Sequence, residues 1–433
     1  MSGEGGLALI HAALARAAAP VTLRIAYSGG RDSHVLLHWL ASERAALGPH
    51  RLRAAHVDHR LHADSARWAE HCAAVCAALD VPLDVHHVNA RPASGDSPEA
   101  AARAARYAAL AAGLEDGDLL LTAHHQTDQA ETVLLALVRG SGLAGAAAMP
   151  AQRRFGRGWL LRPLLDWPAV RVARYADDHG LAWAEDPSNR DARFDRNFVR
   201  AEALPLLAGR WPAAATTLAR HAAHAADAQA LLDEIATADG AHAPQLAVVQ
   251  LAALSPARQR NLLRAWLHRH GAAAPSAARL DELLRQALTA AGDRQVAVAV
   301  GAHRVRVWRG ALYLTPSAVP AAPCVVHWRL DAPLELPGLG QLRAEAVCGQ
   351  GIASARLGAQ PALDVRFRRD DSGGKALKKR LQKLDLPPWQ RDRVPLLYGG
   401  DCLVQVAGGE PVAAWRAGPG EPGVRIVWRP MAP

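Results

Sequence analysis

The chain has 433 residues, half of them apolar, and a formal net charge of +9 at neutral pH. This length allows two or three domains with separate hydrophobic cores. No apolar run is long enough to cross a bilayer and the first residues do not form a signal peptide, so we expect no membrane association and a cytoplasmic location. The positive charge favours a polyanionic partner.

The five cysteines are few for this length and scattered, which is typical of free thiols in a reducing compartment. Cys72 and Cys76 lie four residues apart on a predicted helix and therefore share one face. We interpret both as core residues. The alternative, a metal or iron–sulfur site, lacks a second pair of ligands at a suitable spacing.

The first two hundred residues alternate between strand and helix patterns. Apolar strand patterns fall at residues 21–27, 52–57, 83–88, 118–123 and, more weakly, 159–162. Helical patterns lie between them, at residues 32–47, 65–79, 97–112 and 126–139. Because parallel strands need helical crossovers, we predict an α/β fold with a doubly wound, parallel five-stranded sheet. Ligands of such sheets bind after the strands, here at residues 28–33, 58–59, from Asn89 onward and 124–125.

The pattern changes after about residue 211. An Ala-rich helix and two further helices are predicted at residues 213–238, 256–270 and 276–290, followed by short β-like segments. A Pro-rich joint at 316–323 precedes a region rich in Gly and Pro with short apolar runs. We therefore predict three domains: a nucleotide-binding α/β domain over 1–212, a mainly helical domain over 213–318 and a small mixed α/β domain over 324–433.

A glycine turn connects the first predicted strand to the helix that follows it. Glycines let the backbone approach an oxyanion closely, and the first N–H groups of the helix point at it. The candidate phosphate-binding residues are Ser28, Gly29, Gly30, Arg31, Asp32 and Ser33. The turn is not a Walker A loop, because it lacks the G-x-x-x-x-G-K-[ST] pattern. A plain strand-to-helix cap is the alternative interpretation.

Acidic residues follow the fourth predicted strand. Asp128 and Glu131 lie three residues apart on a helix and share one face, and His124 comes one turn earlier. With Asp32, three carboxylates converge near the glycine turn, which requires a cation among them, either a metal or an ammonium group. A solvated helix face is the alternative. Residues 139–142, Arg-Gly-Ser-Gly, are either ordinary capping or a loop that binds phosphate or tRNA.

Two arginines precede this acidic segment in the chain. Arg103 and Arg106 lie three residues apart, and Glu99 stands four residues before Arg103. One arginine can pair with Glu99 across a helical turn. The other is then available for an anion in the cleft, and we select Arg106.

Further short motifs accompany these segments. Together they are Ser28–Ser33, His56–His59, Glu99–Tyr107, His124–Thr132, Arg139–Leu143, Arg162–Leu165, Glu185–Asn189, Arg196–Arg200, Arg366–Arg369, Leu377–Gln382 and Pro387–Leu397. Their order and joint presence resemble the tRNA(Ile)-lysidine synthetase family of the PP-loop ATP pyrophosphatase superfamily. The resemblance runs nearly end to end and is weakest across residues 215–355.

This resemblance implies an adenine nucleotide α-hydrolase-like fold and a ligase. ATP adenylates the wobble cytidine of tRNA(Ile) with a CAU anticodon, and L-lysine then attacks its 2-position, which changes decoding from AUG to AUA. Asp32, Asp128 and Glu131 would bind or deprotonate the lysine amine, Arg106 its carboxylate or a phosphate, and His124 would contact ATP or the adenylate. The resemblance further implies Mg²⁺ with ATP, leaves the metal ligands open and is compatible with a homodimer.

The lysines of the chain form one cluster in its basic C-terminal region. Its members, which fall largely on one face of a predicted helix, are Lys375, Lys378, Lys379, Arg380 and Lys383. A solvated surface helix is the alternative. In an enzyme that acts on tRNA, we expect these residues to contact phosphates, which positions RNA without reading its sequence.

Two other functions compete with the ligase. One is a PP-loop tRNA thiolase, a 2-thiocytidine or thiouridine synthase, but such enzymes use cysteine pairs and this chain has no C-x-x-C. The other is a non-catalytic tRNA-binding protein, which would not need three acids beside a phosphate site. The ligase is therefore the main hypothesis.

Overall fold

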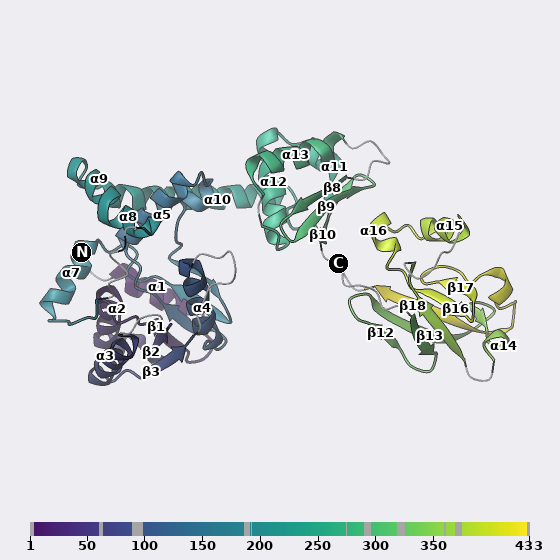
Figure 1. Ribbon diagram of the computed structural model, residues 1–433, viewed down its shortest axis with the longest axis horizontal. Helices are drawn as coiled ribbons and strands as arrows, with labels where there is room; N and C mark the ends of the chain where they lie inside the picture. Colours follow the sequence, from purple (N-terminus) through teal and green to yellow (C-terminus); the bar gives the residue numbers. More distant parts are fainter. Residues whose placement is uncertain are drawn as a thin grey trace. The chain divides into compact units, whose positions relative to one another are not determined.

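The computed structural model describes residues 4–59, 64–88, 98–185, 191, 193–273, 275–289, 296–317, 325–358, 361–368 and 375–430. The chain forms two compact units, Met1–Leu232 and Asp233–Pro433 (Figure 1). Three predicted segments lie outside the described residues: the loop from Asn89 to residue 97, the motif residues at 186–189, and Arg369. For Glu99 and Lys375 the backbone alone is described.

A six-stranded sheet forms the centre of the first unit, in the order β3-β2-β1-β4-β6-β5. Its strands are β1 (Thr22–Ala26), β2 (Arg51–Asp58), β3 (Leu83–His87), β4 (Leu119–Leu121), β5 (Gln152–Phe155) and β6 (Gly158–Leu161). The five predicted strands are parallel, which confirms the α/β fold. β5 is an additional, antiparallel edge strand. It contains Arg153 and Arg154, so an apolar pattern does not reveal it.

Helices cover both faces of this sheet, as predicted. The helices of the nucleotide-binding fold are α1 (Glu4–Leu14), α2 (Arg31–Ser42), η1 (Arg44–Leu47), α3 (Ser65–Ala78), α4 (Pro98–Ala112) and α7 (Ala169–Asp178). Side chains of β4 alternate between the two cores, because Leu119 and Leu121 join one and Leu120 the other. Cys72 and Cys76 are buried in the first core, which confirms that they are packing residues.

Two helical segments outside the sheet carry charged residues that the site uses. They are α5 (Gln126–Val138) with the short α6 (Leu143–Ala146), and the continuous run of α8 (Asp195–Phe198), the π-helical turn η3 (Val199–Ala203) and α9 (Leu204–Arg210). Ala130 of α5 packs against Val199 and Leu204 in a small core. This apolar contact joins the two segments, so the charged side chains that they carry also lie close together. The long helix α10 (Ala214–Ala238) then continues into the second unit.

The second unit begins with a region in which helices predominate and a small sheet accompanies them. Its helices are α11 (Val248–Ala252), α12 (Pro256–Arg269) and α13 (Ala277–Thr289). Its strands β7 (Leu246–Ala247), β8 (Val296–Val300), β9 (His303–Trp308) and β10 (Ala311–Pro316) form a sheet in the order β7-β10-β9-β8. The fully buried Trp266 belongs to the core of this region. The short β-like segments expected after the helices correspond to β8, β9 and β10, whereas the two-residue β7 is too short to give a sequence pattern.

The last region contains two four-stranded antiparallel sheets, in the orders β11-β15-β16-β17 and β12-β13-β18-β14. The strands are β11 (Val325–Arg329), β12 (Leu334–Leu336), β13 (Gly340–Cys348), β14 (Ile352–Ala353), β15 (Ala362–Arg366), β16 (Leu396–Gly399), β17 (Cys402–Val406) and β18 (Pro422–Pro430). The helices are α14 (Ser354–Leu357), α15 (Lys375–Lys383), α16 (Pro388–Arg391) and η5 (Ala413–Trp415). One core includes residues of both sheets, as in a mixed α/β region. Across the described chain, no helix has the length and apolar character of a membrane span.

Candidate active site

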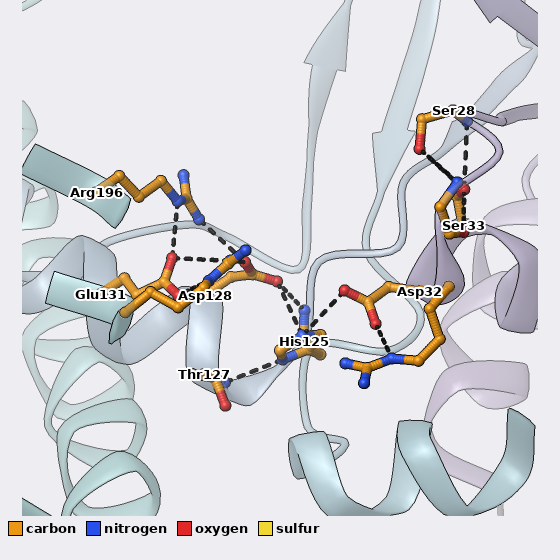
Figure 2. Close-up of polar contacts among 11 residues, drawn as sticks. Ser28, Asp32, Ser33, His125, Thr127, Asp128, Glu131 and Arg196 are labelled. Carbon is orange, nitrogen blue, oxygen red and sulfur yellow. Dashed lines mark hydrogen bonds and ion pairs between the residues drawn. The ribbon is translucent and has the colours of Figure 1, made fainter. Parts of the chain in front are cut away.

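The glycine turn lies where β1 leads into α2. Ser28 and Ser33 close the turn, because their hydroxyl oxygens are 3.0 Å apart and the Ser28 N–H donates to Ser33 Oγ at 3.2 Å (Figure 2). Gly29 has a φ of +84°, and a Cβ there would lie 3.0 Å from Cys72 Sγ. Gly30 caps α2 without a side-chain hydrogen bond. The first N–H groups of α2 have no partner within the helix and are available to an anion, which is the geometry that a phosphate site requires.

His125 connects this turn to the acidic residues of α5. Its Nε2 lies 3.4 Å from Asp32 Oδ2 and 3.6 Å from Asp128 Oδ2, so it stands between the two carboxylates (Figure 2). The Thr127 N–H donates to His125 Nδ1 at 3.2 Å, while the His125 N–H donates to Asp128 Oδ2 at 2.9 Å. This reciprocal cap leaves Nε2 as the nitrogen that carries the proton facing the carboxylates.

The electrostatics of this bridge follow from burial and charge together. Burial disfavours the protonated form of His125, but the hydrogen bond to Asp32 and the charges of Asp128 and Asp32 outweigh it, so its pKa is raised. Burial likewise opposes ionisation of Asp32, but the hydrogen bond and charge of His125, with Arg31, lower the pKa of Asp32. Asp32 is thus ionised at neutral pH beside the phosphate-binding turn.

Two arginines bind the carboxylates of α5 from the other side. Glu131 is fully buried and accepts hydrogen bonds from Arg196 Nε at 2.8 Å and Arg200 Nε at 2.6 Å. Asp128 Oδ1 accepts from Arg196 Nη2 at 3.2 Å and Arg200 Nη2 at 2.8 Å. The cation expected among the acids is therefore supplied, within the described residues, by two guanidinium groups. We call Asp128, Glu131, Arg196 and Arg200 the ion-pair cluster.

His124 and Arg106 lie near the cluster but play different electrostatic parts. His124 Nδ1 is 2.9 Å from Thr122 Oγ1, and burial lowers the pKa of His124 to about 3, so its ring is neutral. Burial lowers the pKa of Arg106, and the charges of Arg103 and Arg196 lower it further, although Tyr107 acts in the opposite direction. Arg106 also lowers the pKa of His59, after burial as the main cause, which indicates that it lies near the end of β2.

The structure thus brings together Asp32, Asp128 and Glu131, with His124 and Arg106 within electrostatic range. His125, Arg196 and Arg200 are site residues that the sequence reasoning did not select. Arg196 and Arg200 belong to one of the short motifs of the sequence, and their four-residue spacing on a helix indicates that both can reach one partner. In the second unit, Lys378, Lys379 and Lys383 of α15 are exposed and Arg380 is half-buried.

Comparison with known proteins identifies the family. Residues 10–207 match the PP-loop domain, 246–313 the TilS substrate binding domain and 359–428 the TilS substrate C-terminal domain. The tRNA(Ile)-lysidine synthase of Alkalilimnicola ehrlichii is 46% identical over 409 residues, 92% of this chain and 91% of that protein. That of Methylococcus capsulatus is 43% identical over 425 residues, 94% of this chain and 96% of that protein. The chain belongs to the tRNA(Ile)-lysidine synthase family.

The family match covers the whole site. The glycine turn, His125 and the ion-pair cluster all fall inside the PP-loop domain match. The tRNA(Ile)-lysidine synthase of Escherichia coli O157:H7 is 40% identical over 417 residues, 94% of this chain and 96% of that protein. Among solved structures, the U34-tRNA thiolase NcsA from Methanococcus maripaludis is 15% identical with a TM-score of 0.41, over 51% of this chain and 76% of that one. That likeness is too distant to assign a function.

We predict that Glu131→Gln loosens the junction between α5 and α8. Neutralising one buried carboxylate leaves two guanidinium groups short of an anion, which we expect to cost about 2–3 kcal/mol, since the arginines are partly exposed. Hydrogen exchange of α5 and η3 amides, followed by mass spectrometry, measures this loss. Asp116→Asn is the control, because Asp116 forms an exposed pair with Arg157. Unchanged protection of α5 in Glu131→Gln would contradict the structural role of the cluster.

We predict that the His124 ring stays neutral down to pH 5. The unfolded chain binds this proton near pH 6.5, whereas the folded chain binds it only near pH 3. His124 therefore costs up to about 1.4 kcal/mol of stability per pH unit as the pH falls between these values. NMR of the ¹³Cε1-labelled histidines, with the signal assigned by His124→Gln, should show no titration above pH 5. The exposed His221 serves as a reference, and a His124 midpoint near 6.5 would contradict the prediction.

Proposed function

We propose that this chain is a ligase that joins L-lysine to the 2-position of the wobble cytidine of tRNA(Ile) with a CAU anticodon. The observation that carries this proposal is the junction of a phosphate-binding turn with an acidic site through Asp32, His125 and Asp128. Splitting ATP requires a phosphate-binding turn, and binding an amine requires acidic side chains. Family membership supports the same assignment.

The reaction proceeds in two steps, adenylation of the cytidine and then its substitution by lysine. First, the 2-carbonyl oxygen of cytidine attacks the α-phosphorus of ATP, so an O–P bond forms and pyrophosphate leaves. Then the ε-amine of lysine attacks C2, the C–O bond breaks, and AMP departs with the oxygen while the amine loses a proton. A carbonyl oxygen is a poor leaving group until it carries a phosphoryl ester, which is why one ATP is consumed.

The glycine turn acts in the first step. Its backbone N–H groups and the hydroxyls of Ser28 and Ser33 hold the phosphates of ATP and stabilise the departing pyrophosphate. Among the described residues, no group of three or more His, Cys, Asp or Glu side chains is placed to hold a metal by itself. Mg²⁺ commonly binds through one or two carboxylates and the substrate phosphates, and Asp32 fits this role. When bound, the ion neutralises phosphate charge.

The acidic residues act in the second step. The Asp32 side chain is 32% exposed, against 10% for Asp128 and 0% for Glu131, so the incoming ammonium meets Asp32 first. Asp128 takes part as the partner of His125, and it is one candidate for the base. Glu131 positions Arg196 and Arg200 around Asp128. Neutral His124 donates or accepts a hydrogen bond at ATP or the adenylate, and Arg106 binds a phosphate or the lysine carboxylate.

The thiolase hypothesis is the weaker one. A sulfur carrier must be a thiolate that is accessible to its substrate. Burial raises the pKa of the Cys72 thiol to about 12 and that of Cys76 to about 11, and both side chains are enclosed in the core. Neither can transfer sulfur from these positions.

The proposal also covers the roles of the domains, the cellular location and the oligomeric state. Residues 1–212 form the catalytic domain, and residues 213–318 and 324–433 bind tRNA, with phosphates contacted by the exposed side chains of α15. A tRNA substrate is found in the cytoplasm, so the protein acts there. A homodimer is a prediction that sedimentation velocity can test.

We predict that purified protein incorporates labelled lysine into total tRNA when ATP is present, and that Asp32→Asn lowers this rate at least about 100-fold, because the variant loses an anion beside both substrates. Pyrophosphate release that requires tRNA and lysine together separates the ligase from a thiolase and from a binding protein. Asp116→Asn is the control, because Asp116 pairs with Arg157 at an exposed position outside the turn. Full activity of Asp32→Asn would remove this residue from the mechanism.

We predict that replacing Lys378, Lys379 and Lys383 with Gln weakens tRNA binding and lowers its dependence on salt. Each lost phosphate contact reduces the slope of log Kd against log salt by about 0.7–0.9, the range from single strands to B-form DNA. Filter binding over a range of salt concentrations measures the slope. The triple Lys→Arg variant retains the charges and should behave like the unaltered protein. An unchanged slope in the Gln variant would assign α15 to a solvated surface.

A further inference from the structure

A cavity of about 710 Å³ lies along α5, next to the ion-pair cluster. Four arginines from three parts of the first unit line it, namely Arg103 of α4, Arg139 after α5, and Arg193 and Arg196 at the start of α8. Asp195 is the one acid among its described lining residues. Arg196 lines this cavity and also belongs to the ion-pair cluster, where it binds Asp128 and Glu131 (Figure 2). The cavity is therefore contiguous with the active site.

The arginines of this cavity can change partners at little cost. Arg139 pairs with Asp195 at 2.9 Å, with side chains that are 66% and 71% exposed. Arg193 pairs with Asp191 at 2.7 Å and is 88% exposed. Exposed ion pairs contribute little to stability, and guanidinium groups match the geometry of phosphate oxygens especially well. Both arginines can therefore exchange a carboxylate for a phosphate.

We propose that this cavity binds the phosphate backbone of the tRNA strand that enters the active site. This inference rests on the proposed function and names a surface for its RNA substrate. The size and charge of the cavity favour this occupant, because phosphodiesters repeat along a strand and four arginines can meet several of them. The ring of Phe194 lines the same cavity, and arginines mixed with aromatic rings are typical of sites for single-stranded RNA.

Free lysine fits this cavity poorly. Its carboxylate stands next to an α-ammonium group, which four arginines repel. Cavities of about 300–1,000 Å³ enclose ligands far larger than one amino acid, so lysine would leave most of this volume empty. The RNA strand is the better match in both charge and volume. A strand bound along α5 contacts Arg196, which also binds Asp128. This shared contact places the bound nucleotide next to the acidic residues.

The test compares two matched double variants. Arg139→Gln/Arg193→Gln removes two cavity arginines that contact neither the glycine turn nor the cluster. Arg157→Gln/Arg174→Gln removes two arginines of the same unit outside the cavity, which also form exposed pairs, with Asp116 and Asp178. Fluorescence anisotropy with a synthetic CAU anticodon stem-loop at several salt concentrations gives Kd and its salt slope. The steady-state KM values for tRNA and lysine are measured in parallel.

We expect the cavity variant to bind the stem-loop about tenfold more weakly, with a slope lowered by about 0.7 for each arginine removed, while the control keeps both values. Equal salt slopes for the two variants would overturn the assignment of this cavity to RNA. Lysine incorporation by the unaltered protein would still support the ligase in that case. A rise in the KM for lysine alone would also overturn it, in favour of an amino-acid site. A selective loss of slope in a protein that incorporates no lysine would support the cavity and reject the ligase.

Discussion

Neutralisation of Glu131 by Arg196 and Arg200 is the interaction on which the site depends. A fully buried carboxylate is costly unless it is paired and hydrogen-bonded, and here both oxygens are bound by guanidinium groups. The pairing joins α5 to α8 and η3, whose small apolar core would give little stability alone. Because Asp128 shares the same arginines and also caps α5, this junction fixes His125 and, through it, the distance to Asp32.

The two halves of the site have opposite electrostatic character. Backbone N–H groups at the start of α2 favour anions, whereas the Asp32 carboxylate, which contacts His125 and Arg31, favours cations. His125 lies between Asp32 and Asp128 and holds the two carboxylates at a fixed spacing. A phosphate tail and an ammonium group are therefore attracted to neighbouring positions without competing for one. This separation is what an enzyme needs when one substrate is highly negative and the other is a cationic amine.

The sequence predicted those features that depend on neighbouring residues. Strand periodicity located the five parallel strands, and helical spacing placed Asp128 and Glu131 on one face. The partners of these acids were not predictable in the same way, because Arg196 is 68 residues from Asp128 and such pairing depends on tertiary packing. The sequence also favoured His124 over His125. The structure instead puts His125 at the helix cap between the carboxylates, while His124 at the strand end hydrogen-bonds Thr122.

The ion-pair cluster also bears on the order of events. Asp128 and Glu131 carry two negative charges and Arg196 and Arg200 two positive ones, so the cluster has no surplus anion for an incoming ammonium. A phosphate bound at Arg196 from the side of the cavity would change that balance, because it shares the guanidinium and restores negative charge to Asp128. Binding of the polyanion and binding of the amine then favour each other through a common group, as linkage requires. Under the proposed function, lysine would therefore bind more tightly once the RNA phosphate is in place.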